Sequence, residues 1–139
     1  MWLAILVALL LLFGRRIANP PESENAIALI ADAIAHAEGF FAGNTLPRRK
    51  NNPGSITRDG QLIQYPTEQD GWNALYRQIE SMLYGWSSYY SPDMTILQVA
   101  HVYTGEDKPE AWANIVASRL GVSVNDVWNN LPSLLEATA

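Results

Sequence analysis

The stretch that decides the fold is AEGFFAGNTLPRRKNNPGSI, which runs from Ala37 to Ile56. Its second and third residues are Glu38 and Gly39, a carboxylate followed by the residue type that most often ends a helix. The rest is rich in Gly, Pro and Asn, which favour turns over helix. The stretch therefore marks the point where a helix gives way to a turn-rich segment, with a carboxylate at the junction.

The segment before this stretch is predicted to be a helix from about Glu24 to Glu38. Residues at spacing i, i+4, i+7 and i+11 lie on one helical face, and here they are Ile27, Ala31, Ile34 and Glu38. A carboxylate on an apolar face is partly buried, and burial raises its pKa, as a general acid requires. The spacing leaves one alternative open, in which Glu38 is an exposed residue at the end of the helix.

The segment after the stretch is predicted to be a small antiparallel hairpin. Ser55–Arg58 and Gln61–Tyr65 are short runs on either side of Asp59 and Gly60, and Asp-Gly is a strong hairpin-turn signal. Phe40–Pro66 as a whole shows no helical period.

Four more helical segments are predicted from capping residues and apolar spacing. Three of them are predicted to start at a capping pair, which is Thr67 with Asp70, Thr95 with Gln98, and Ser123 with Asp126. The remaining one, third in order, is predicted to start at Pro109. The first of these helices should end near Trp86, the third should end at Gly121, and the last should be only a turn or two. The predicted fold class is α+β, mainly α, with one hairpin inserted after the first helix.

Length and composition limit the possible classes of protein. The chain has 139 residues, enough for one domain with a core, here placed at residues 17–139. Its net charge of −5 argues against nucleic acid as a partner, because binding phosphates requires an excess of Lys and Arg. The absence of cysteine excludes disulfides and cysteine-based sites.

The first residues form an apolar run, MWLAILVALLLLF, from Met1 to Phe13. The run lacks the positive start and the cleavage site of a signal peptide, so residues 1–16 are predicted to be an uncleaved membrane anchor; a cleaved signal is the alternative. Arg15 and Arg16 follow the run and would keep the domain in the cytoplasm under the positive-inside rule. The expected location is the membrane of a virus particle, or a bacterial inner membrane with the domain facing the periplasm.

The Ala37–Ile56 stretch resembles the lysozyme-like domains of many bacteriophage and bacterial proteins, whose fold is similar to that of soluble lytic transglycosylases and goose-type lysozymes. In that family a helix ends in Glu-Gly-Phe, and an Asn-rich segment with Pro-Gly begins the hairpin; here that segment is RKNNPGSI. Ser55 replaces the usual Asn, and Lys50 interrupts the Arg-Asn run. Three later pieces also resemble the family, in order: TEQDGWNAL (67–75), TILQVAHVY (95–103) and AWANIVASRLGVSVNDV (111–127).

The resemblance covers roughly residues 25 to 130 and implies an enzyme that degrades peptidoglycan by cleaving the glycan strand between its two amino sugars. It places Glu38 at the position of the family's catalytic glutamate. Because some members are virion proteins, it also implies a phage-particle protein with the glycan strand and other virion proteins as partners. The apolar run separately predicts a membrane partner, bound through residues 1–13.

Four residues are candidates for binding substrate. Asn51, Asn52 and Ser55 can exchange hydrogen bonds with sugar hydroxyl and acetamido groups, or equally can stabilise the turns they occupy. Tyr103 ends a helix where related enzymes often place a tyrosine near the glutamate; a core aromatic is the alternative.

A second carboxylate would complete the pair that most glycosidases use. Asp59 is the nearest candidate, although its turn with Gly60 accounts for it well. The mechanism favoured here uses Glu38 alone, with help from the substrate's own N-acetyl group. No metal or cofactor is expected, since His36 and His101 are isolated in the sequence.

Two other functions compete with catalysis. One is a non-enzymatic virion or membrane structural protein that reuses the lysozyme-like fold, and the other is a module that binds peptidoglycan without cleaving it. The aromatic residues around the 84–90 segment either stack on sugars or pack against a neighbouring chain: Tyr84, Trp86, Tyr89 and Tyr90. The sequence alone leaves these alternatives open.

Overall fold

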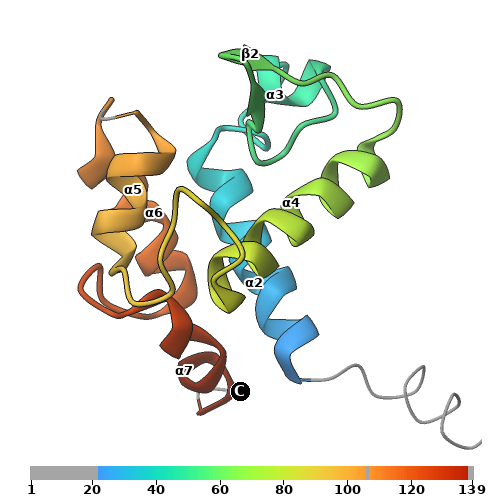
Figure 1. Cartoon of the computed structure of the whole chain (residues 1–139). Coiled ribbons are helices and arrows are strands. Elements are labelled where there is room, and N and C mark those ends of the chain that lie inside the picture. The colour runs from blue at the N-terminus through green and yellow to red at the C-terminus, as the bar shows by residue number, and fades with distance from the viewer. Residues whose placement is uncertain (1–21, 106, 138–139) are drawn as a thin grey trace, which may run out of the picture.

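The computed structural model describes residues 22–105 and 107–137, and these form a mainly helical α+β domain (Figure 1). The predicted fold class is confirmed at this level. The elements in order are α2 (Glu22–Ala37), α3 (Leu46–Arg49), β1 (Thr57–Arg58), β2 (Gln61–Leu62), α4 (Glu68–Tyr84), α5 (Ile96–Tyr103), α6 (Pro109–Leu120), the 3₁₀ helix η1 (Trp128–Asn130) and α7 (Leu131–Ala137).

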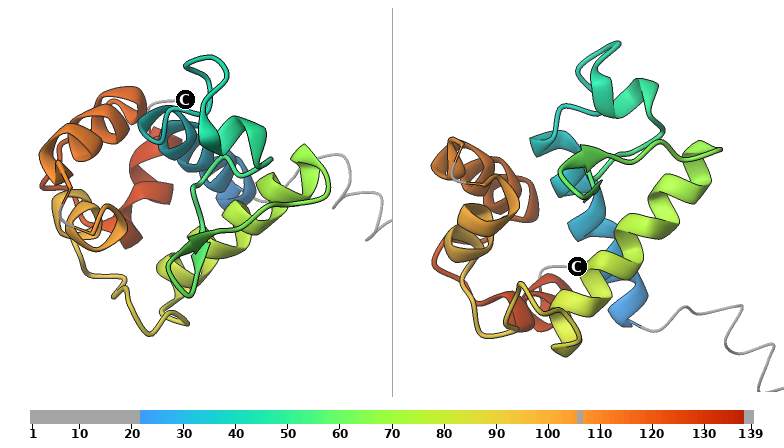
Figure 2. Two further views of the ribbon diagram at one scale, coloured as in Figure 1. Left: turned by 90° about the horizontal axis from the view of Figure 1, so that it is seen from above. Right: turned by 45° about the horizontal axis from the view of Figure 1, so that its top comes forward.

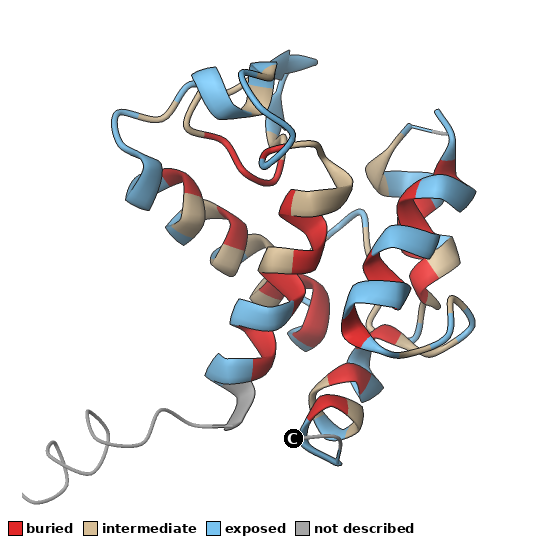
Figure 3. Cartoon of the chain, turned by 180° about the vertical axis from the view of Figure 1, so that it is seen from behind, coloured by how far each residue is buried: buried red, intermediate tan, exposed pale blue. Residues whose placement is uncertain are grey.

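Helix α2 is the centre of the domain. It packs against α4 on one side and against α6 and α7 on the other (Figure 2). The predicted apolar face is buried, and Ile30, Ala33 and Ala35 are buried as well, so the hydrophobic surface of α2 extends well beyond one stripe. Figure 3 shows the buried residues concentrated on α2 and on the inner faces of its neighbours.

The hairpin forms where it was predicted but is shorter. β1 and β2 are antiparallel, with Thr57 opposite Leu62 and with Asp59 and Gly60 at the tip. One more backbone bond, from Ile63 N to Ile56 O at 3.0 Å, continues the pairing beyond the strands. The strand pairing ends there, because the buried Asn52 side chain forms hydrogen bonds with the backbone of Ile56 and Ile63.

The capping signals locate α4 and α5, but the predicted Ser123–Asp126 cap is wrong, because this pair closes a turn and η1 begins only at Trp128 with no side-chain cap. The Thr67 hydroxyl accepts a hydrogen bond from Asp70 N, and Thr95 and Gln98 form the complete reciprocal capping box. Helix α6 begins at Pro109 and is followed by Gly121, as predicted. Two elements were not predicted: the single turn α3, and α7, which extends the predicted last turn to Ala137.

The hairpin segment contacts α4 unusually closely at Gly71. A Cβ on Gly71 would lie 1.8 Å from the Asn51 carbonyl oxygen and 2.9 Å from Pro53 Cδ. Only glycine permits this approach, because any side chain would overlap a backbone atom that cannot move aside. Gly71 thereby fixes the distance between α4 and the segment that leads into Ser55.

No helix within residues 22–105 and 107–137 is both long enough and apolar enough to cross a bilayer. The predicted membrane anchor at residues 1–16 lies outside the described residues.

Candidate active site

Glu38 sits at the C-terminal end of α2, where the backbone makes a sharp reversal. Gly39 adopts a left-handed conformation with φ of 80°, and Phe40 N and Gly39 N bond to Ala35 O and His36 O. This pattern is the Schellman motif, which needs a residue able to adopt positive φ after the last helical turn. The motif ends the helix and leaves the Glu38 side chain at its edge.

Two side chains from distant parts of the chain hold the Glu38 carboxylate. Trp112, buried on α6, donates a hydrogen bond from Nε1 to Glu38 Oε1 at 2.9 Å. The Ser55 side chain at the start of the hairpin also hydrogen-bonds to the carboxylate. The carboxylate therefore has a defined position between α6 and the hairpin segment.

The surroundings of Glu38 favour its protonated form. Burial raises the pKa of this carboxyl above its ordinary value, and the hydrogen bonds from Trp112 and Ser55 lower the pKa by less. Glu38 also lies at the negative end of the α2 dipole, which disfavours a negative charge there. A half-buried carboxyl with a raised pKa is suited to donate a proton near neutral pH.

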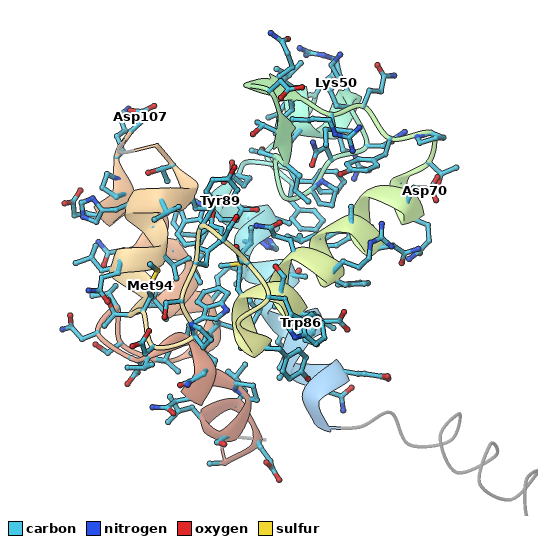
Figure 4. The ribbon with its side chains drawn as sticks, in the orientation of Figure 1. Lys50, Asp70, Trp86, Tyr89, Met94 and Asp107 are labelled. Atoms are coloured by element: carbon cyan, nitrogen blue, oxygen red, sulfur yellow. The ribbon has the colours of Figure 1, made fainter. Side chains whose placement is uncertain are left out.

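Two adjoining pockets make a groove past Glu38. The Glu38 pocket, of about 340 Å³, is lined by Glu38 and Trp112 and by residues of the α5–α6 connection. The hairpin pocket, of about 480 Å³, lies between the hairpin, α4 and the loop that carries Tyr89 and Tyr90. Ser55 and Tyr103 line both pockets, so the two pockets adjoin at these residues, and together they are called the groove. Figure 4 shows Tyr89 on the loop between α4 and α5, on the side of the hairpin.

Tyr103 is placed beside Glu38, as predicted. Its ring stacks on Trp112 with centroids 4.9 Å apart, and its hydroxyl donates to Gly54 O at 2.5 Å. Burial first, and the Glu38 charge second, raise the pKa of Tyr103 well above its ordinary value; the same two causes raise the pKa of Tyr90 to about 12. Tyr103 lines both pockets, and its hydroxyl is engaged with the backbone at Gly54.

Ser55 is held in a strained conformation. Its φ is 48°, in the left-handed region where Asn and Gly are favoured over other residues. Lys108 in the Glu38 pocket and Asp59 in the hairpin pocket also have positive φ, at 55° and 53°. Three of the four non-glycine residues with positive φ among the described residues thus line the groove, and such strain is concentrated at functional sites.

Asn52 and Asn51 have structural roles that account for their side chains. Asn52 is fully buried; its amide donates to Ile56 O and Ile63 O, and its oxygen accepts from Ile56 N. Asn51 has a φ of 51° and donates to Tyr65 O at 3.1 Å. Neither residue lines the groove. The complete burial of Asn52 favours the turn-stabilising alternative for that residue, and sugar binding by the partly buried Asn51 stays a prediction. Ser55 and Tyr103 remain the predicted binding residues that the groove brings to Glu38.

The carboxylate that shares the pocket with Glu38 is Asp107, not the sequence-based candidate Asp59. Asp59 lines the hairpin pocket at the turn and does not line the Glu38 pocket. Asp107, which the sequence did not single out, is exposed at the edge of the Glu38 pocket (Figure 4). Asp107 directly precedes Lys108, the residue before α6. Its place just before the predicted helix start at Pro109 was the only sequence signal that could have drawn attention to it.

Trp112 is the main functional residue that the sequence analysis missed. It belongs to the predicted apolar face of α6, and nothing in its own neighbourhood indicates that its ring nitrogen meets Glu38. Across the described parts of the chain, no group of three or more His, Cys, Asp or Glu side chains is arranged to hold a metal ion. Comparison with models of protein families, with curated proteins and with solved structures gave no match.

Proposed function

We propose that this chain cleaves the glycan strand of peptidoglycan, with Glu38 as the general acid and then the general base. The observation that carries the proposal is the state of Glu38: a half-buried carboxyl of raised pKa, hydrogen-bonded by Trp112 and open to a groove. The family resemblance of the Ala37–Ile56 stretch supports the same assignment. A peptidoglycan-degrading enzyme of lytic transglycosylase or lysozyme type is the function that these features support best.

The proposed reaction uses one protein carboxyl. Glu38 donates its proton to the glycosidic oxygen as the bond from that oxygen to C1 breaks, and the acetamido oxygen of the same sugar attacks C1. The Glu38 carboxylate then takes the proton from the sugar's own 6-hydroxyl as that oxygen attacks C1. The product is a 1,6-anhydro sugar, the acetamido group is released, and Glu38 is protonated again.

The test is to incubate the full chain with purified peptidoglycan and to identify the released muropeptides by mass. Anhydro-muropeptides would support the single-carboxyl reaction. Reducing-end products would indicate hydrolysis, which usually needs a second carboxylate. Asp107 in the Glu38 pocket would then be the first candidate to test. A folded chain that releases nothing would sink the enzymatic proposal in favour of a structural or binding protein.

Trp112 should set the upper pH limit of the reaction. Trp112→Phe keeps a ring against Tyr103 but removes the hydrogen bond that lowers the Glu38 pKa. The Glu38 pKa then rises further, and because the acid must be protonated, the alkaline limb of the pH–rate profile should move to higher pH. Initial rates of muropeptide release across pH measure this. Trp72→Phe is the control, because Trp72 packs on Phe40 and lines neither pocket, and it should leave the limb in place. An unmoved limb in Trp112→Phe would contradict the assignment.

Tyr89 should contribute to binding rather than to chemistry. Its side chain is 77% exposed and lines the hairpin pocket, where its ring can stack on a sugar face. Loss of one aromatic contact in Tyr89→Ala should raise KM for soluble glycan strands roughly 2- to 10-fold with little change in kcat. Trp86→Ala is the matched control, because Trp86 is 73% exposed and lines neither pocket. Equal KM values for the two variants would remove Tyr89 from the binding site.

A further inference from the structure

The end of α4 carries an aromatic pair that is exposed to solvent. Tyr84 and Trp86 are 51% and 73% exposed, and their ring centroids lie 5.1 Å apart. Each ring carries a polar group, which is the hydroxyl in Tyr84 and the ring N–H in Trp86. Two large exposed rings with polar tips on one small patch are a feature of surfaces that contact a partner.

The aromatic pair lies at the end of the domain where α2 begins. Helices α2 and α4 pack together and run in opposite senses in Figure 1, so the C-terminal end of α4 and the first turn of α2 share the lower end of the domain. Figure 4 shows Trp86 at this lower end, away from Tyr89. Residues 1–21 precede Glu22, so they join the domain at the same end as the pair.

The short segment between the apolar run and α2 limits how far this end of the domain can lie from the run. Met1–Phe13 contains no polar side chain, and only Gly14–Pro21 separates it from α2. Eight fully extended residues span at most about 28 Å. If the run inserts in a bilayer, the first turn of α2 cannot be farther than that from the membrane surface, and the aromatic pair lies at the same end of the domain.

We propose that Tyr84 and Trp86 form a second membrane contact, lying in the headgroup region of the bilayer that holds Met1–Phe13. The inference does not depend on glycan cleavage. Tyr and Trp favour this region because their rings are apolar while their hydroxyl and ring N–H can bond to headgroup oxygens. Two rings suffice, because the tether supplies a high effective concentration of membrane at the pair.

A bilayer accounts for the pair better than the two other occupants. The apolar run folded back on the pair would leave most of its thirteen residues in water, since two rings cover only a small part of it. A second copy of the chain would bury one small patch, well below the area of a stable interface. Both remain distinguishable by experiment.

The contact would orient the active site. Glu38 lies at the opposite end of α2 from the aromatic pair, and a helix of 16 residues is about 24 Å long. With the pair in the headgroups, Glu38 and the groove beside it are held above the bilayer.

The experiment uses the full chain labelled with 5-fluorotryptophan in phosphatidylcholine nanodiscs, with the Trp86 signal identified from Trp86→Phe. A lipid that carries a spin label at its headgroup should broaden the Trp86 fluorine signal far more than that of Trp112, which lies beside Glu38 at the other end of α2. A soluble relaxation agent should broaden Trp86 less in nanodiscs than in the chain without lipid. Tyr89→Trp is the matched control, and its new signal should stay open to the soluble agent.

Several results would overturn the proposal. Loss of the Trp2 signal to the spin-labelled lipid while the Trp86 signal persists would show an anchored chain whose aromatic pair stays in water. Survival of both signals would show that the chain does not engage the bilayer. Trp86 broadening that follows protein concentration would assign the pair to a second copy, and protection of Trp86 without lipid would assign it to the apolar run.

Discussion

Glu38→Gln is expected to lower the rate of muropeptide release by about 100- to 10,000-fold, the range over which a positioned acid contributes to catalysis. Glutamine keeps the size of the side chain and can still accept the hydrogen bond from Trp112, but it has no proton to give to the glycosidic oxygen. Product release, measured by mass from purified peptidoglycan, tests this directly. Glu110→Gln changes an exposed acid on α6 and should leave the rate unchanged. Similar rates for Glu38→Gln and the unaltered chain would end the proposed role of Glu38.

The same variant should be more stable than the unaltered chain at neutral pH. The ordinary pKa of the Glu38 carboxyl is about 4.5, and folding raises it. As the pH rises from 4.5 through the folded pKa, the unfolded chain loses this proton before the folded chain does, so the stability of the unaltered chain falls. Glu38→Gln lacks this loss, and thermal melts at pH 4 and pH 7 should show a gap that opens only at the higher pH. This result separates lost activity from lost folding.

Gly71→Ala is expected to lower the free energy of unfolding by about 3 kcal/mol. The added carbon would lie 1.8 Å from the Asn51 carbonyl oxygen, so either α4 or the Asn51–Gly54 segment must shift. Urea denaturation followed by circular dichroism measures the change. Asn73→Ala, at an exposed position on the same helix, should change stability by less than about 0.5 kcal/mol.

The strain from Gly71→Ala should also reach the groove. Ser55 follows the displaced segment and hydrogen-bonds to Glu38, so the variant should lose activity even at temperatures where it remains folded. Unfolding midpoints that coincide for Gly71→Ala and Asn73→Ala would mean that the close approach at Gly71 carries no weight.

Local signals in the sequence predicted most of the fold. The Thr95–Gln98 capping box, the turn at Asp59 and Gly60, and the helix end before Gly39 each depend on residues within a few positions of one another. For α7 the signal was also present, since Leu131, Leu134 and Leu135 have helical spacing. The single turn α3 had little signal, because it is four residues long and contains Pro47 amid turn-forming neighbours.

The candidate site was predictable only in part, since its contacts are non-local. Spacing on one helix placed Glu38 on the buried face, but its partner Trp112 comes from another helix, and no pattern around either residue records the contact. Asn52 shows a different limit. An amide side chain can bond to a sugar or to the backbone with the same atoms. The sequence does not show that Asn52 is completely buried, and this burial is what leaves only the backbone as its partner.

The hydrogen bond between Trp112 and Glu38 joins residues 74 positions apart, with the hairpin, α4 and α5 formed by the chain between them. During synthesis the acid is made early and the tryptophan that holds it is made late. A nascent or truncated chain that stops before α6 has the glutamate without its partner and without that wall of the groove. Completion of the fold is therefore the step that assembles the site, and an unfinished chain would lack the proposed activity.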